Sequence, residues 1–474
     1  MLFNSFQYPL FLIGCLLIFF CLPCRGRLYF LWLVSIVFAF LWNWQTGLIL
    51  LFETVVAYAA ARYVDSRSSE IKRKWAVGLA AVLLLVGLAF FKYADFFLDS
   101  CSLARSWFGI SEPLPHLKLL LPVGISFYSF MCLGYVIDVY RKKCAAETNW
   151  FRVGLFAGFF PYFASGPIGQ AADLLPQFRE DRHCTPENLE IGFRLILWGL
   201  FKKVVIADRL AQFADPVFAA PENYTGFTAL VAMYFFTIQI YCDFSGYSDI
   251  AIGSAKMFGI DLMQNFRQPY FADSIYEFWK RWHISLTSWF RNYMYIPMGG
   301  NRVPFWRWQF NIFMVFLVSG LWHGAAWTFV IWGALHGIVY LLEQWGKKGL
   351  ARLCPGVSFA WAKGVRILFT FHIVAAAWIF FRSASFSSAV TFLARMSGHW
   401  GPFQWGATKI PVCIAFALIV FLFFAEVLIA LGWSGDYLDK GRCPGWLRCV
   451  GYGGLLCGLA LLGVRSSSFI YLQF

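Results

Sequence analysis

Charged side chains are scarce in this sequence: Asp, Glu, Lys and Arg together make up 14% of its 474 residues. Soluble domains contain about 25% charged residues. A single soluble core cannot bury a chain that is 60% hydrophobic and 20% aromatic, whereas a lipid bilayer accepts such residues on the outside of a fold. The composition therefore excludes an ordinary soluble enzyme and predicts an all-α polytopic membrane protein.

Acidic residues are especially few, 25 against 39 Lys and Arg, which gives a net charge of +14. The basic residues stand between apolar runs, where they set the orientation of membrane helices. We therefore expect the lipid bilayer, and no nucleic acid, as the partner of this positive charge.

Several familiar catalytic motifs are missing. The sequence has no Gly-x-Ser-x-Gly, Walker A loop, His-Glu-x-x-His or dinucleotide-binding fingerprint, which disfavours serine hydrolases, ATPases and zincins. No cluster of metal ligands is visible, so we expect no metal. The thirteen cysteines lie mostly inside apolar runs, which disfavours a disulfide framework.

Apolar runs recur along the whole chain, at or near the roughly 20 residues that a helix needs to cross a bilayer. We expect 10–12 crossings within a single membrane domain over residues 1–474, with the short or Gly- and Pro-broken runs re-entrant or interfacial. The candidate runs are 7–24, 28–44, 46–62, 75–92, 119–140, 151–166, 190–207, 227–252, 309–320, 322–342, 363–382, 411–432 and 449–464.

Basic loops predict the orientation. Arg25 and Arg27 follow the first run, 62–74 follows the third, and 141–143 follows the fifth. The positive-inside rule places these three loops in the cytoplasm, so we expect an extracytoplasmic N-terminus.

The least apolar stretch, 265–308, contains one amphipathic helix over 273–293. Ser274 and Glu277 have the spacing of a capping box, which predicts a helix start. His283 falls about 80° from the centre of the apolar face, taking roughly 100° per residue. It is therefore either an interfacial histidine beside lipid headgroups or a residue that supports catalysis.

A tight turn follows this helix, with Gly299 and Gly300 before Asn301 and Arg302. The residues fit a plain turn. They also fit an anion site, because exposed backbone N–H groups beside an arginine can hold a phosphate.

The sharpest feature is His323 within an apolar run, at the start of a helix expected over about 322–342. Ionisable residues inside a membrane mark function by default, although a histidine hydrogen-bonded across helices remains an alternative. The small residues around it leave room for a substrate, and Trp322 and Trp327 are candidate walls of that space. The small residues are Gly320, Gly324, Ala325 and Ala326.

A buried histidine suits the role of base in acyl transfer. Attack of a hydroxyl on a thioester needs a base, and a buried imidazole stays neutral and able to accept the proton. His336 lies about 20 Å further along the same expected helix, so the two cannot share a site unless the helix breaks. We interpret His336 and His372 as packing residues. Asp243 and Asp249 are expected to pair with cations such as Lys256 or Arg267, or to orient a histidine.

The sequence resembles the membrane-bound O-acyltransferase family, in particular its bacterial branch that acts on alginate and teichoic acid. The resemblance covers most of the chain. It is strongest at Phe278–Leu286, Tyr295–Arg302 and Gly320–Trp327, and extends to Gln239–Gly253, Ser165–Ile168 and the opening Met1–Ser5.

This resemblance implies a many-helix fold with a tunnel through a thinned centre. The essential histidine of the family matches His323 and its second motif histidine matches His283. The family departs from this chain at Gln170, Asn292 and Cys242, where a basic residue, Asp and an aromatic residue are more usual, which leaves the acceptor and any anion contact near Gln170 open.

The resemblance also implies a function. We expect an O-acyltransferase of the bacterial inner membrane that passes an acetyl group from acetyl-CoA to an exported polysaccharide such as alginate or cellulose, helped by a periplasmic partner protein. His323 and His283 are the expected catalytic residues. The candidates for donor binding are Arg281, Asn301, Arg302, Trp322 and Trp327.

Two alternatives stay open. One is transfer from an acyl carrier protein, as in D-alanylation of teichoic acid. The other is a non-catalytic component of polymer secretion, such as a transporter or a scaffold, in which neither histidine is needed for modification.

Overall fold

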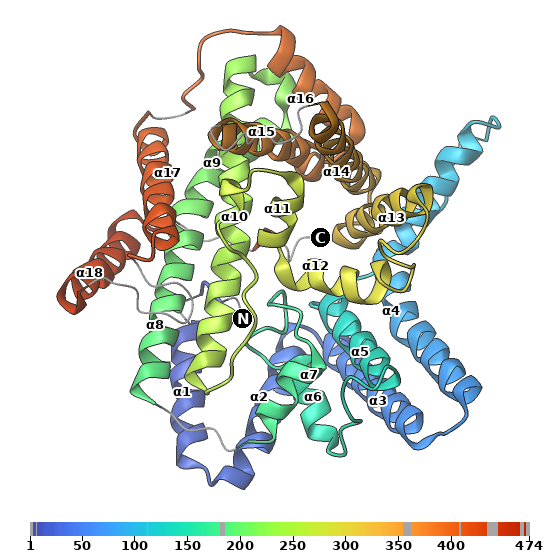
Figure 1. Cartoon of the computed structure of the whole chain (residues 1–474). Coiled ribbons are helices and arrows are strands. Elements are labelled where there is room, and N and C mark those ends of the chain that lie inside the picture. Colours follow the sequence, from blue (N-terminus) through green and yellow to red (C-terminus); the bar gives the residue numbers. More distant parts are fainter. Residues whose placement is uncertain are drawn as a thin grey trace. The chain divides into compact units, whose positions relative to one another are not determined.

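A computed structural model of the chain describes residues 3–5, 7–110, 112–180, 185–353, 362–406, 409–433, 444–464 and 469–470. Met1 and Leu2 of the opening motif lie outside these residues. Every regular element in the described ranges is a helix, which confirms the predicted all-α class (Figure 1).

The α-helices vary in length from 4 residues in α7 to 37 residues in α4, with short 3-10 and π-helical segments (η) between them. They are α1 (Gln7–Cys21), α2 (Cys24–Trp42), α3 (Trp44–Ser66), α4 (Glu70–Ser106), α5 (Ile125–Tyr140), α6 (Trp150–Gly158), α7 (Ala171–Leu174), η1 (Pro176–Phe178), α8 (Pro186–Leu200), η2 (Phe201–Ala207), α9 (Asp208–Ala219), η3 (Pro221–Asn223), α10 (Gly226–Met257), η4 (Pro269–Phe271), α11 (Ile275–Arg281), α12 (Ile284–Phe290), η5 (Arg291–Tyr295), α13 (Phe305–His323), α14 (Trp327–Leu353), α15 (Lys363–Arg382), α16 (Phe386–Gly398), α17 (Lys409–Ala430) and α18 (Gly445–Leu462).

Seven of the described helices are long and apolar enough to cross a membrane. These are α2, α3, α4, α10, α15, α17 and α18, and the shorter apolar helices α1 and α5 accompany them. Large apolar side chains on these helices stay exposed, for example Ile410 and Val420 of α17 at 72% and 70%. Exposed aliphatic residues along a helix are typical of a lipid-facing surface, so the chain is a multi-pass membrane protein.

The chain forms two compact units. Of the described residues, the first unit contains those within 1–192 and 251–263, and the second contains those within 193–250 and 264–470. The boundary falls within α8 and within α10. The expectation of one membrane domain over the whole chain stays a prediction.

Buried ion pairs fix α10 within the second unit. Lys202 of the π-helical segment η2 lies 2.7 Å from Asp249, and Lys203 lies 2.6 Å from Asp243. All four side chains are at most 3% exposed, so each charge is compensated where water cannot reach it. The prediction that these two carboxylates pair with cations is confirmed, but the partners are Lys202 and Lys203 of η2 and not the suggested Lys256 or Arg267.

Helices α13 and α14 pack side by side as an antiparallel hairpin (Figure 1). The chain leaves the helical path at 324–326, so His323 is the last residue of α13, and the helix expected over 322–342 begins only at Trp327. Gly320 and Gly333 face each other, and a Cβ atom on either would overlap the opposite backbone. This close approach of two helices needs glycine at both positions.

Candidate active site

His283 lies at a break between two short helices. The structure replaces the single helix expected over 273–293 with α11 and α12, which are joined at His283 in the left-handed conformation (φ 46°, ψ 53°). The predicted start is confirmed, since the Ser274 hydroxyl accepts a hydrogen bond from the Glu277 N–H at 3.2 Å. A left-handed histidine costs about 1–3 kcal/mol, and residues held so cluster at functional sites.

The break turns His283 from the expected flank position into the protein, where its side chain is fully buried. Its Nδ1 lies 3.1 Å from the Asn265 side-chain oxygen. The Ser285 backbone N–H (3.3 Å) and hydroxyl (2.9 Å) donate to the same oxygen. The Ser285 backbone N–H can only donate, so the Asn265 atom that it meets is the amide oxygen and not the amide nitrogen. The same oxygen faces Nδ1 of His283. Nδ1 of the neutral ring therefore bears the hydrogen, and Nε2 keeps the lone pair.

Burial lowers the pKa of His283 to about 3, because the apolar surroundings disfavour the charged imidazolium. The ring edge meets Phe244 with centroids 4.7 Å apart. His283 is therefore a neutral imidazole at physiological pH, in the tautomer that can accept a proton at Nε2.

His323 lies beside it. The two imidazole centroids are 6.2 Å apart, and Trp322 contacts both rings, at 5.9 Å from His283 and 5.1 Å from His323. Trp332 of α14 and Phe381 of α15 complete the ring contacts of His323 at 5.0 and 5.6 Å. Two histidines that the sequence placed in separate motifs thus share one buried site.

The small residues around His323 act differently from the expectation. A Cβ on Gly324 would overlap the Phe329 ring, and Gly320 is packed against α14. These glycines bring two helices together instead of leaving room for a substrate.

The candidates for donor binding separate into two groups. Trp322 lies in the site and is 3% exposed. Trp327 is 53% exposed at the start of α14, while Arg281 is half-buried and Asn301 and Arg302 are exposed near the turn after η5. The structure thus brings Trp322 together with the two histidines, and the three polar candidates lie on more accessible segments.

Sequence reasoning missed Asn265 and Trp332. Asn265 stands in a non-helical stretch before α11, and nothing in its neighbours predicts that it orients a histidine. Trp332 reaches His323 only because the chain reverses at 324–326. A glycine in each of the two apolar helices was the only signal of that close reversal.

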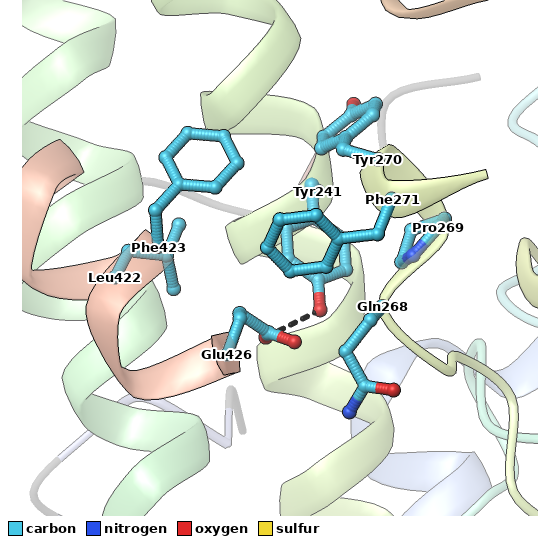
Figure 2. A pocket seen from close by; sticks show the side chains of 8 residues that line it. All are labelled: Tyr241, Gln268, Pro269, Tyr270, Phe271, Leu422, Phe423 and Glu426. Carbon is cyan, nitrogen blue, oxygen red and sulfur yellow. Dashed lines mark hydrogen bonds between the residues drawn. The ribbon is translucent and has the colours of Figure 1, made fainter. Parts of the chain in front are cut away.

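A recess beside α10 and α17 is a separate feature (Figure 2). Its lining includes Tyr270, Phe271 and Phe423, and the Tyr241 hydroxyl donates to the Glu426 carboxylate there at 2.7 Å. Neither His283 nor His323 lines it. The recess therefore lies outside the histidine site, and a hydrogen bond from Tyr241 holds the buried Glu426 there.

A multi-helix membrane fold with two buried histidines side by side fits base-catalysed acyl transfer within a membrane. Residues 149–386 match the model of MBOAT, the membrane-bound O-acyltransferase family, and the chain belongs to that family.

Curated relatives agree with this assignment. The chain is 38% identical over 387 residues to a probable alginate O-acetylase of Azotobacter vinelandii, covering 80% of this chain and 74% of the relative. It is 36% identical over 398 residues to a peptidoglycan O-acetyltransferase of Helicobacter pylori, covering 78% and 73%. A teichoic acid D-alanyltransferase of Bacillus subtilis is 28% identical over 295 residues, covering 57% and 72%.

Proposed function

We propose that this protein transfers an acetyl group from acetyl-CoA in the cytoplasm to hydroxyl groups of an exported polysaccharide. The names of the more similar relatives, an alginate O-acetylase and a peptidoglycan O-acetyltransferase, support acetyl transfer to a polymer outside the cell. The more distant D-alanyltransferase supports the alternative of a carrier-protein donor.

One observation carries the proposal: the buried rings of His283 and His323 lie 6.2 Å apart although they come from different motifs. In the proposed reaction His323 accepts the proton of the attacking hydroxyl. The hydroxyl oxygen bonds to the thioester carbonyl carbon, the C–S bond breaks, and the leaving thiolate takes up the proton. His283 is the helper, held by Asn265 in the tautomer that presents a lone pair.

The route across the membrane is part of the proposal. The donor enters from the cytoplasm, where the exposed residues Asn301 and Arg302 and the half-buried Arg281 contact its phosphate groups. The protein lies in the bacterial inner membrane with its N-terminus outside. A periplasmic partner protein assists this transfer to the sugar hydroxyls.

The decisive experiment measures the acetyl content of the secreted polysaccharide in a strain that carries His323→Ala. We expect acetylation to fall at least 100-fold while the variant stays in the membrane at wild-type abundance, because base catalysis contributes about 10²–10⁴-fold. His372→Ala is the matched control, since His372 lies in α15 and Nδ1 of its ring is hydrogen-bonded to the Leu368 carbonyl of the same helix. Persistent acetylation in His323→Ala would leave a transporter or scaffold as the better reading.

A further inference from the structure

The hairpin of α13 and α14 brings a third histidine to the site. His336 of α14 is 1% exposed, and its ring lies 5.0 Å from Trp332, centroid to centroid. The opposite helix presents His323 to the same indole, also at 5.0 Å. From the sequence, His323 and His336 could share a site only if the helix between them breaks. The chain does leave the helix at 324–326, and Trp332 contacts both histidines.

Aromatic rings surround His336. Trp279 of α11 meets it edge-on at 5.1 Å, Phe278 stacks on it at 6.3 Å, and Phe316 of α13 stacks at 6.4 Å. These residues come from α11 and α13, which enclose the imidazole together with Trp332 of its own helix. The interpretation of His336 as a packing residue accounts for its burial but leaves its polarity unexplained.

The cluster contains many polar atoms that the fold does not satisfy. Among the described residues, neither ring nitrogen of His336 has a hydrogen-bond partner, and the same holds for four buried indole nitrogens. The indoles form a connected series, with centroids 5.7, 5.4 and 5.0 Å apart in order along it: Trp279, Trp332, Trp378 and Trp282.

Leaving a buried polar group unsatisfied costs about 1–3 kcal/mol, and a phenylalanine at each position would fill similar space without that cost. The indole N–H can only donate, and a neutral imidazole has one donor and one acceptor. Four indoles and one imidazole therefore present five donors and a single acceptor. Such a cluster fits an uncharged ligand that is rich in carbonyl oxygens.

We infer that His336, with Trp279 and Trp332, binds carbonyl oxygens of the thioester arm of the acyl donor, next to His323. The inference rests on the proposed function and names a donor-recognition residue for it. Coenzyme A and acyl carrier proteins end in the same pantetheine arm, which has two amide carbonyls, no charge, and the thioester at its tip. The site therefore recognises the part that both kinds of donor share.

The test is binding of S-acetylpantetheine to the purified full-length protein in detergent, measured by calorimetry. We expect His336→Phe to raise the Kd about 10-fold, the effect of losing one hydrogen bond of about 1.4 kcal/mol. His336→Asn, which keeps a donor and an acceptor, should recover part of the affinity. His372→Phe is the matched control and should bind as the wild type does.

Two further variants make the outcome decisive. His323→Ala should bind S-acetylpantetheine normally while losing acetylation, so a failure of catalysis is distinct from a failure of donor recognition. Trp279→Phe removes one N–H and keeps an aromatic ring, and it replaces His336→Phe if that variant does not fold. Unchanged affinity in the folded His336 and Trp279 variants, or no binding by the wild type, overturns the inference.

Discussion

Asn265 controls the chemistry of His283 through one oxygen. Because that oxygen accepts from Nδ1, the lone pair of His283 stays at Nε2, and the absence of a charge on Asn265 lets burial keep the imidazole neutral. A carboxylate in its place would orient the ring equally well but would favour the imidazolium. The amide of Asn265 therefore keeps His283 neutral down to a lower pH than a carboxylate would.

Replacing Asn265 with Asp tests this choice. With a pKa of about 3, His283 of the wild type should cause no loss of acetyl transfer as the pH falls from 8 to 5. In Asn265→Asp the pKa of His283 should rise by about 1–3, so His283 becomes protonated at higher pH and the helper loses its lone pair earlier on acidification. The measurement is the rate of acetyl transfer by membranes across this pH range.

The control for that profile is Asn188→Asp, a change of the same charge at a half-buried position in α8, away from the histidines. It should leave the pH profile of the wild type unchanged. An Asn265→Asp profile that overlays that of the wild type would show that Asn265 does not set the protonation of His283.

At the scale of elements, the site depends on how closely α13 and α14 approach. Gly320 and Gly333 let the two backbones meet, and this contact places Trp332 against His323. The sequence did not predict the arrangement, because Gly324 is the single turn-favouring residue in 324–326 (Gly-Ala-Ala) and glycine is also frequent inside membrane helices. The motif around His323 was visible from the sequence, whereas its partner across the hairpin was not.

Gly333→Ala should therefore separate the helices. The added methyl overlaps the Phe316 carbonyl, and overpacking of this kind costs about 1–3 kcal/mol, so both thermal stability in detergent and polysaccharide acetylation should fall. Gly346→Ala in the same helix meets nothing within 4 Å and should leave both unchanged or raise stability by up to about 1 kcal/mol. Equal melting temperatures for the two variants would contradict the role of this close contact.

The same limit explains the break at His283. The periodicity of apolar residues over 273–293 favoured one helix, and the capping residues at its start were predicted correctly. A single left-handed residue, His283, interrupts that helix. The conformational free-energy cost of this backbone is offset by burial of the imidazole against Asn265 and Phe244. Those contacts come from other parts of the chain, so local periodicity has no information about them.

For the whole molecule, composition was the stronger guide. A chain with so few charges could only be a membrane protein, and seven of its described helices are long and apolar enough to cross a bilayer. The runs over 190–207 and 309–320 were expected as spans too. The run over 190–207 divides between α8 and the π-helical η2, where Lys202 and Lys203 are buried in ion pairs. The run over 309–320 lies inside α13. Hydropathy over these runs did not predict where the helices begin and end.

The orientation of the chain is the property of the whole molecule that most directly tests the proposed route of the acetyl group. Basic loops predict that the segment before α4 faces the cytoplasm, and α4, at 37 residues, is long enough to carry the chain to the other side. Ser68→Cys and Leu117→Cys place exposed thiols on the two sides of this helix. Each should be made in a variant whose native cysteines are replaced by serine or alanine.

A membrane-impermeant maleimide should label Leu117→Cys in spheroplasts with an intact inner membrane, and Ser68→Cys only after that membrane is permeabilised. This pattern places the start of α4 in the cytoplasm, as the basic loops predict. Labelling of Ser68→Cys in intact spheroplasts would reverse the orientation of α4. The exposed turn at Asn301 and Arg302 would then need a separate topological test before it could be assigned to a cytoplasmic donor.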